Sequence, residues 1–96
     1  MYVHIAIYQW RPGTSDAEVD RLLQGIRSLT GKVPGLSSIH VGKSYSPHSK
    51  HFTHAIVVLG ESQGALDAYR AHPDHHALAE QIDAVEQDGI GVDFIG

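Results

Sequence analysis

The segment 69–75, Tyr-Arg-Ala-His-Pro-Asp-His, interrupts a helical pattern in the second half of the chain. Pro73 disfavours helical geometry at the residue before it, and a proline is well suited to the first position of a new helix. We therefore expect a short helix from Gln63 to about Ala71, with Ser62 as its N-cap, and a second helix beginning at Pro73. Gly89 is expected to end this second helix, and its apolar face carries His75, Leu78, Ile82 and Val85.

Another helix is predicted upstream, after Ser15. Ser15 and Glu18 have the spacing of a capping box, in which the serine hydroxyl accepts from the Glu18 N–H and the glutamate carboxylate reaches back. Apolar side chains follow at helical spacing and form one stripe, which consists of Val19, Leu22, Leu23, Ile26 and Leu29. Gly31 suits the C-terminal cap, and the turn Val33-Pro34-Gly35 ends the helix.

Four strands are predicted around these helices. Residues 2–10 alternate with a period of two, which is typical of a strand; Val3, Ile5 and Ile7 share one face, and His4, Ala6, Tyr8 and Trp10 share the other. Further strands are expected at Leu36–Lys43, Phe52–Leu59 and Ile90–Ile95. The resulting β-α-β-β-α-β order is the ferredoxin-like motif, an α+β fold with a four-stranded antiparallel sheet and helices on one face. Residues 1–96 form a single domain.

Both faces of this sheet are predicted to be apolar. The first and third strands carry bulky side chains on both sides, although helices cover only one side. An uncovered apolar face of that size marks an interface, and so short a chain buries a modest share of its surface when folded alone. We therefore expect a homodimer in which two sheets pack face to face. The sequence leaves open which face forms the seam.

The composition argues against several classes of function. The formal net charge is -4 with histidine neutral, and the seven lysines and arginines are scattered, so no basic stripe follows a nucleic-acid backbone. No segment is long enough to span a bilayer, and we expect a cytoplasmic protein with neither membrane nor nucleic acid as partner. The lack of cysteine excludes disulfides and thiolate chemistry.

The eight histidines do not form a recognisable metal motif. Pro73 prevents His72 from forming a regular helical ligand pair with His75 or His76, and no phosphate-binding loop or cofactor fingerprint occurs. We expect no metal and no cofactor. His4 and His54 lie on strands with apolar neighbours, and the motif makes these strands adjacent, which allows both rings to face one cavity. The alternative is that each is a buried histidine bonded to the backbone or to another side chain. Several acidic residues are expected to face solvent, namely Asp16, Asp20, Glu80, Asp83 and Glu86.

Segments along the whole chain resemble the stress-responsive A/B barrel (Dabb) family. The most specific is residues 69–75, which is similar to the Tyr-x-x-His-Pro-x-His segment of that family. The others are Val3-His4-Ile5, Val33-Pro34-Gly35-Leu36, Val41-Gly42, Phe52-Thr53-His54-Ala55-Ile56-Val57, Ala68-Tyr69 and Val92-Asp93-Phe94. The resemblance implies a dimeric α+β barrel. The family includes plant stress-response proteins and polyketide cyclases such as olivetolic acid cyclase.

The resemblance also implies site residues. In the cyclases, a tyrosine and a histidine line a pocket between helices and sheet and promote an aldol condensation; these roles fall on Tyr69 and His75. Where the cyclases carry aromatic residues on the first helix, this chain has Leu22, Leu23 and Ile26, so the substrate is expected to differ. Residues expected to contact a small hydrophobic or aromatic ligand are His4, Tyr8, Leu23, Ile26, His54, Ile56 and His72.

Elementary chemistry supports these roles. His75 would lie near the positive N-terminal end of a helix, which disfavours imidazolium and leaves a neutral ring suited to a general base. A Tyr69 hydroxyl donates to a carbonyl or enolate oxygen. The leading hypothesis is cofactor-free acid–base catalysis of the cyclase or lyase type. Two alternatives remain: a non-catalytic stress or ligand-binding dimer with structural histidines, and a cofactor-free monooxygenase of the kind found in another dimeric α+β barrel family.

Overall fold

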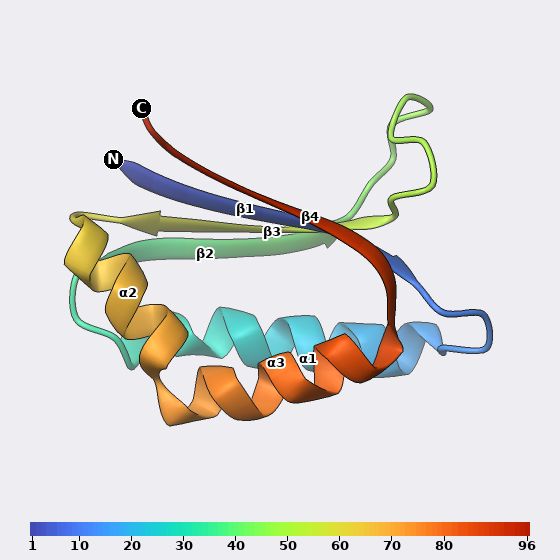
Figure 1. The fold of residues 1–96 in the computed structure, drawn as a ribbon, viewed down its shortest axis with the longest axis horizontal. Coiled ribbons are helices and arrows are strands. Elements are labelled where there is room, and N and C mark those ends of the chain that lie inside the picture. The colour runs from blue at the N-terminus through green and yellow to red at the C-terminus, as the bar shows by residue number, and fades with distance from the viewer.

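A computed structural model describes all 96 residues as one antiparallel sheet covered on one face by helices. The elements are β1 (Tyr2–Trp10), α1 (Asp16–Arg27), a 3₁₀ turn (Ser28–Gly31), β2 (Leu36–Lys43), β3 (His54–Gly60), α2 (Gln63–Ala71), α3 (Pro73–Val85) and β4 (Glu86–Ile95). The strand order is β2-β3-β1-β4, and Figure 1 shows the helices as one layer below the sheet. The predicted ferredoxin-like α+β fold is therefore confirmed. No helix is long and apolar enough to cross a bilayer.

The first helix begins as predicted and ends differently. The Ser15 hydroxyl accepts from the Glu18 N–H at 3.1 Å, but the Glu18 carboxylate accepts from Arg21 at 2.7 Å and does not reach back to the cap. The helix tightens into the 3₁₀ turn after Arg27. The left-handed residue of this connection is Gly35, with φ of 86°, and not Gly31. A side chain at Gly35 would also collide with Ala65, whose Cβ would lie 2.9 Å away.

The last strand begins four residues earlier than predicted. α3 ends at Val85, whose carbonyl accepts from the Arg11 N–H at 2.8 Å, and pairing with β1 starts immediately at Trp10 and Glu86. The register of the β1–β4 pairing shifts at Gln9/Trp10, where β4 begins directly after α3. Gly89 therefore lies inside β4 and does not stop the helix. The third strand begins at His54, two residues later than predicted.

The packed core lies between α1 and the β2–β3–β1 part of the sheet. The apolar stripe of α1 is buried, with Leu22 fully inaccessible and Ile26 1% exposed. It packs against helix-facing residues of the sheet, which include Ile39, Ile56, Val58 and Ala6. β1 therefore turns its His4–Ala6–Tyr8 face toward the helices.

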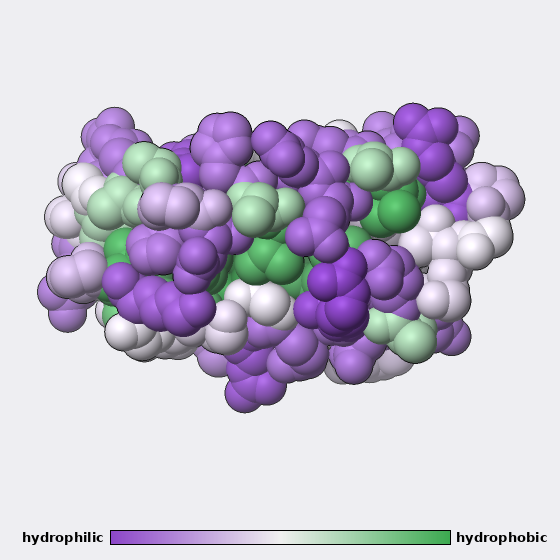
Figure 2. All heavy atoms as spheres, turned by 90° about the horizontal axis from the view of Figure 1, so that it is seen from below, coloured by the Kyte–Doolittle hydropathy of each residue, from purple (hydrophilic) through white to green (hydrophobic).

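The opposite face of the sheet is apolar and uncovered. Residues paired across antiparallel strands share a face, so Val3, Ile5 and Ile7 lie beside Phe94, Val92 and Ile90 of β4 on this side. The three β4 residues are 47–49% exposed. In contrast, the outer surface of the helix layer is mostly hydrophilic (Figure 2). Only the Ile5 face of the sheet is free of helices.

Candidate active site

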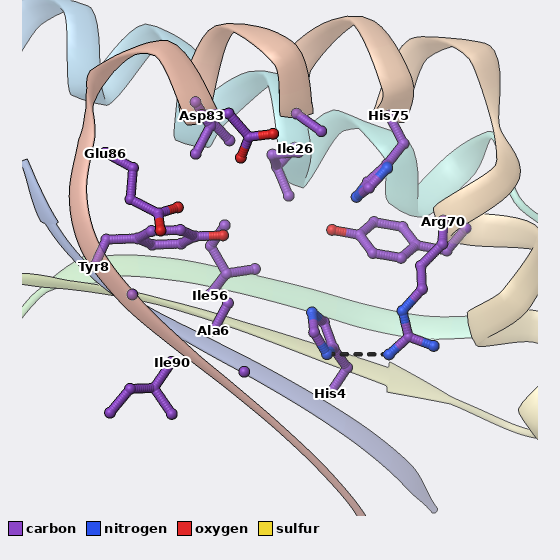
Figure 3. A pocket seen from close by; sticks show the side chains of 15 residues that line it. His4, Ala6, Tyr8, Ile26, Ile56, Arg70, His75, Asp83, Glu86 and Ile90 are labelled. Carbon is purple, nitrogen blue, oxygen red and sulfur yellow. Dashed lines mark hydrogen bonds between the residues drawn. The ribbon is translucent and has the colours of Figure 1, made fainter.

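A cavity of about 410 Å³ lies between α3 and the β1–β4 part of the sheet (Figure 3). Its volume is in the range of small-molecule sites. β1 and β4 form its floor, α3 forms its roof, and the end of α2 closes one side. Its lining residues are His4, Ala6, Tyr8, Ile26, Ile56, Tyr69, Arg70, His75, Ala79, Ile82, Asp83, Glu86, Gly89, Ile90 and Gly91.

The cavity exists because β4 lacks side chains at two helix-facing positions. Gly89 pairs with Tyr8 and Gly91 pairs with Ala6, so both glycines occupy the face that the helices cover. A Cβ added at Gly91 would meet no atom within 4 Å, which means that it would project into open space. Ile90 between them points away from the cavity (Figure 3). The alternation of glycine and apolar residues in β4 therefore leaves space on one face and forms an apolar surface on the other.

Tyr69 and His75 meet at the wall of this cavity, on either side of Pro73. Their ring centroids are 4.5 Å apart in an edge-to-face arrangement. Tyr69 is only 2% exposed, and no hydrogen bond within the chain involves its hydroxyl. No fully occluded side-chain oxygen or nitrogen lacks a partner, so the hydroxyl must reach the cavity surface. Burial raises the pKa of Tyr69, which keeps the hydroxyl protonated as a donor.

His75 is held neutral by its surroundings. Burial is the main cause that lowers its pKa, and the positive charges of His4, Arg70 and His76 lower it further, whereas the backbone of Arg70 acts in the opposite direction. The neutral ring predicted from the sequence is thus consistent with the structure, although desolvation is the dominant cause. A half-buried neutral imidazole beside a phenol is suited to accept a proton.

His4 belongs to a polar cluster on the floor of the cavity. Its Nδ1 lies 2.6 Å from Asp93 Oδ1 and 3.2 Å from Arg70 Nη2, and Arg70 Nη2 donates to Asp93 Oδ2 at 2.7 Å. Because the carboxylate contact is the shorter, we assign Nδ1 as the protonated nitrogen that donates to Asp93. The other ring nitrogen, Nε2, makes no hydrogen bond within the chain. The His4 hydrogen bond, followed by Arg70, lowers the pKa of Asp93.

The other end of the cavity is acidic. Tyr8, Asp83 and Glu86 lie together there (Figure 3). Burial, with the charges of Glu86 and Asp83, raises the pKa of Tyr8 to about 12. Burial, Asp83 and Asp88 raise the pKa of Glu86. The sequence predicts that both acids face solvent. Asp83 is exposed, as predicted, whereas Glu86 is half-buried, and both residues also line the cavity. The pattern that indicates this lining is the helical spacing of His75, Ala79, Asp83 and Glu86 on the cavity side. Arg70 was missed, although it adjoins Tyr69.

His54 and Leu23 lie outside this cavity, in a smaller hollow beside α1. His4 pairs with Val58, whereas His54 pairs with Tyr8, and four residues along a strand span about 13 Å. The stacked rings of Tyr8 and Trp10 lie at that end, and Trp10 Nε1 donates to His54 Nδ1 at 3.0 Å. The expectation that His4 and His54 face one cavity is therefore corrected.

His72 has a structural position. Its Nδ1 accepts from the Asp74 N–H at 3.0 Å, so the ring caps α3, and it does not line the cavity. Of the nine site residues predicted from the sequence, six line one cavity, namely His4, Tyr8, Ile26, Ile56, Tyr69 and His75. The remaining three are Leu23, His54 and His72. No group of three or more potential metal ligands is arranged to hold an ion.

Comparison with known proteins identifies a matching family and several solved structures with the same fold. The family model described as Stress responsive A/B Barrel Domain matches residues 3–95. A solved structure of an Arabidopsis thaliana protein superposes with a TM-score of 0.88 at 23% identity, covering 100% of this chain and 95% of the other. A dimeric ferredoxin-like protein of unknown function from Thermobifida fusca gives 0.86 at 23%, covering 99% and 90%. A hydroxynitrile lyase from Passiflora edulis gives 0.88 at 16%, covering 99% and 92%. No curated protein matches the chain.

Proposed function

This chain belongs to the stress-responsive A/B barrel domain (Dabb) family, and from that premise we propose that it is a homodimeric, cofactor-independent enzyme acting on a small carbonyl compound. The cavity under α3 binds the substrate. Tyr69 donates a hydrogen bond to the carbonyl oxygen, and His75 removes a proton from the adjacent carbon. The observation that carries the proposal is the contact between Tyr69 and His75 at the cavity wall, with a Tyr69 hydroxyl that has no partner in the protein.

The proposed step requires the two groups to act together. His75 takes the proton, the C–H electron pair forms an enolate, and the enolate oxygen accepts from the Tyr69 hydroxyl. The enolate carbon then adds to a second carbonyl of the same substrate, and the alkoxide that forms takes the proton back from the His75 imidazolium. Without a second carbonyl, the enolate carbon itself recovers a proton from imidazolium. His4, whose Nδ1 is committed to Asp93, offers Nε2 as a further polar contact. One structural neighbour is a lyase, which supports an enzymatic use of this fold.

Hydrogen–deuterium exchange tests this step without knowledge of the natural substrate. The probe is para-ethylacetophenone in deuterium oxide, and proton NMR follows the loss of its acetyl methyl signal. We expect the protein to accelerate exchange, and His75→Gln and Tyr69→Phe each to reduce the acceleration by about 100-fold or more. His76→Gln is the matched control, because that ring is exposed and does not line the cavity.

The outcomes separate an enzyme from a binding protein. If the ketone binds but exchange equals that in buffer, the site is a ligand-binding site and the catalytic proposal fails. If His76→Gln slows exchange as strongly as His75→Gln, the assigned base is wrong. Binding is measured on the same samples from chemical-shift changes of the Tyr69 and His75 rings.

The homodimer is proposed from the apolar open face of the sheet. Ile5 and Val57 are paired on this face, next to Val92, and several neighbours of the same fold are described as dimeric. Ile5→Asp or Val57→Asp would bury an unpaired charge, so we expect the dissociation constant of the dimer to rise by at least about 100-fold. Sedimentation velocity measures it. Tyr45→Asp, on a fully exposed side chain, is the control; an unchanged dimer in both sheet variants would contradict this seam.

A further inference from the structure

The two ends of the cavity differ in charge. Figure 3 shows His75, Arg70 and His4 at one end and Tyr8, Asp83 and Glu86 at the other. Between them lie the apolar side chains of Ala6, Ile26, Ile56, Ala79 and Ile82. The first end contains the groups assigned above to the carbonyl. The second end has no role in that chemistry.

The carboxylates of the acidic end have no cationic partner. Neither Asp83 nor Glu86 takes part in any of the ion pairs of the chain. Arg70 is the only lysine or arginine on the cavity wall, and it is bound to Asp93 at 2.7 Å on the opposite end. Exposed Asp83 and half-buried Glu86 thus form an acidic end of the cavity with no compensating positive charge, an arrangement that attracts a cation.

An independent feature indicates that a polar ligand enters the same cavity. Tyr69 is 98% buried, yet its hydroxyl is without a partner and opens on this space. Because this hydroxyl faces the cavity and has no partner in the protein, it is free to donate a hydrogen bond to a ligand carbonyl. The glycine at position 91 keeps the passage between the two ends open, since a side chain there would enter empty space.

We infer that the substrate is an aminocarbonyl compound: a ketone or related carbonyl at the Tyr69–His75 end, joined by an apolar spacer to a protonated amine at the Asp83–Glu86 end. This inference rests on the proposed function for the role of Tyr69 and adds the class of substrate. The ammonium group donates to the two carboxylates, and the spacer contacts Ile26, Ile56 and Ile82. Anionic compounds of the same size are excluded by repulsion from the same carboxylates.

A matched pair of ligands tests the acidic end. The probes are para-(aminomethyl)acetophenone and its near-isostere para-ethylacetophenone, which differ only in an ammonium or a methyl group at the same position. Binding is measured by isothermal titration calorimetry near neutral pH. We expect the ammonium probe to bind at least about tenfold more tightly, because a charge-assisted hydrogen bond in a partly desolvated site contributes that much or more.

Substitutions test whether Asp83 and Glu86 cause the preference for the ammonium probe. Asp83→Asn and Glu86→Gln keep the shape of each side chain and remove its charge, and together they should abolish the preference for the ammonium probe. Glu80→Gln removes the same charge from the same helix at an exposed position outside the cavity, so it should leave the preference intact. Gly91→Leu fills the cavity and should eliminate binding of both probes.

The possible failures are distinguishable. Equal binding of the two probes, or an equal loss of preference in Glu80→Gln, overturns the ammonium site and leaves the carbonyl site in place. Absence of binding by both probes at millimolar concentration overturns both the ammonium site and the proposed function. Binding that persists in Gly91→Leu shows that the probes occupy another surface, which also contradicts the inference.

Discussion

The helix layer covers the sheet in two halves that differ in kind. Under α1 the side chains are closely packed: Leu22 and Val58 are fully buried, and Ile26 is 1% exposed. Under α3 only Ile82 is buried among the thirteen residues of the helix, and a cavity remains between it and β4. The half under α1 therefore contains the packed core, and the half under α3 contains the cavity. The difference follows from the residues that face each helix.

The packed half receives large aliphatic side chains from both layers, whereas the hollow half receives small or polar ones. β4 contributes Gly89, Gly91 and Asp93 to the helix-facing side, and α3 contributes Ala79 and Asp83. Such residues cannot fill the space, and the charged ones carry a cost unless water or a ligand solvates them. The hollow half therefore contributes less to stability and is available for binding.

The largest expected effect is the loss of a packed leucine. Leu22→Ala removes a side chain that is fully enclosed, so we expect the free energy of unfolding to fall by about 2–5 kcal/mol. Leu78→Ala on α3, where the side chain is only partly buried against the core, should cost about 1–2 kcal/mol. Urea denaturation at one fixed protein concentration measures both, since a dimer's stability depends on concentration. Equal costs would contradict the division into halves.

The two glycines of β4 should respond in opposite directions. A Cβ at Gly89 would lie 2.7 Å from a Glu86 carboxylate oxygen and 3.3 Å from the Ile7 carbonyl oxygen, so Gly89→Ala should destabilise the fold by about 1–2 kcal/mol. Gly91→Ala meets open space and removes flexibility from the unfolded chain, so it should stabilise by about 0.5–1 kcal/mol. The same denaturation experiment measures them. Destabilisation by Gly91→Ala would mean that the cavity is filled at that point.

The helix caps extend the comparison to the ends of α1 and α3. Ser15→Ala removes the acceptor of the Glu18 N–H and should cost about 1 kcal/mol. His72→Ala removes the acceptor of the Asp74 N–H, but Pro73 already fixes the backbone for the first turn of α3, so the cost should be about 0.5 kcal/mol. Because His72 does not line the cavity, ligand binding should be unchanged in this variant. A loss of ligand binding in this variant would show that His72 contributes to the binding site.

The fold was predictable because its signals are local. The alternation in β1, the Ser15 cap and the break at Pro73 each act within a few residues, and the structure has all three. The errors concern places where tertiary contacts override local preference. Glycine is a residue type that commonly ends helices, yet Gly89 pairs with Tyr8 and lies within β4.

The site was predictable only in part, because it depends on register. Tyr69 and His75 are close in sequence and their meeting followed from one segment. His4 and His54 have the same local pattern, but they lie at opposite ends of their paired strands. The acidic end was missed because Asp83 and Glu86 have the composition of a solvated helix face, and only the two glycines across from them reveal the cavity.

The smallest effect in this series is a pH dependence that compares one histidine from each half. Burial is the main cause that lowers the pKa of both His75, in the hollow half, and His54, beside the packed half. As the pH falls, these histidines take up a proton at about pH 6.5 in the unfolded chain, and only at a lower pH in the folded protein. Stability is therefore fully present above pH 6.5 and is lost as pH falls toward the lowered pKa values. His75→Gln and His54→Gln should each reduce this loss, and denaturation at a series of pH values measures it.

Ligand binding then separates the two rings. His75 opens on the cavity, whereas the His54 ring is held by Trp10 at 3.0 Å and by Thr53 at 2.8 Å. A neutral ketone in the cavity displaces water from His75 and disfavours its charged form, so saturation with para-ethylacetophenone should lower the pKa of His75 further. The His54 titration should stay where it is, because its environment does not change. NMR titration of the ring protons follows both at once, and a shift of His54 equal to that of His75 would show that the two halves respond as one.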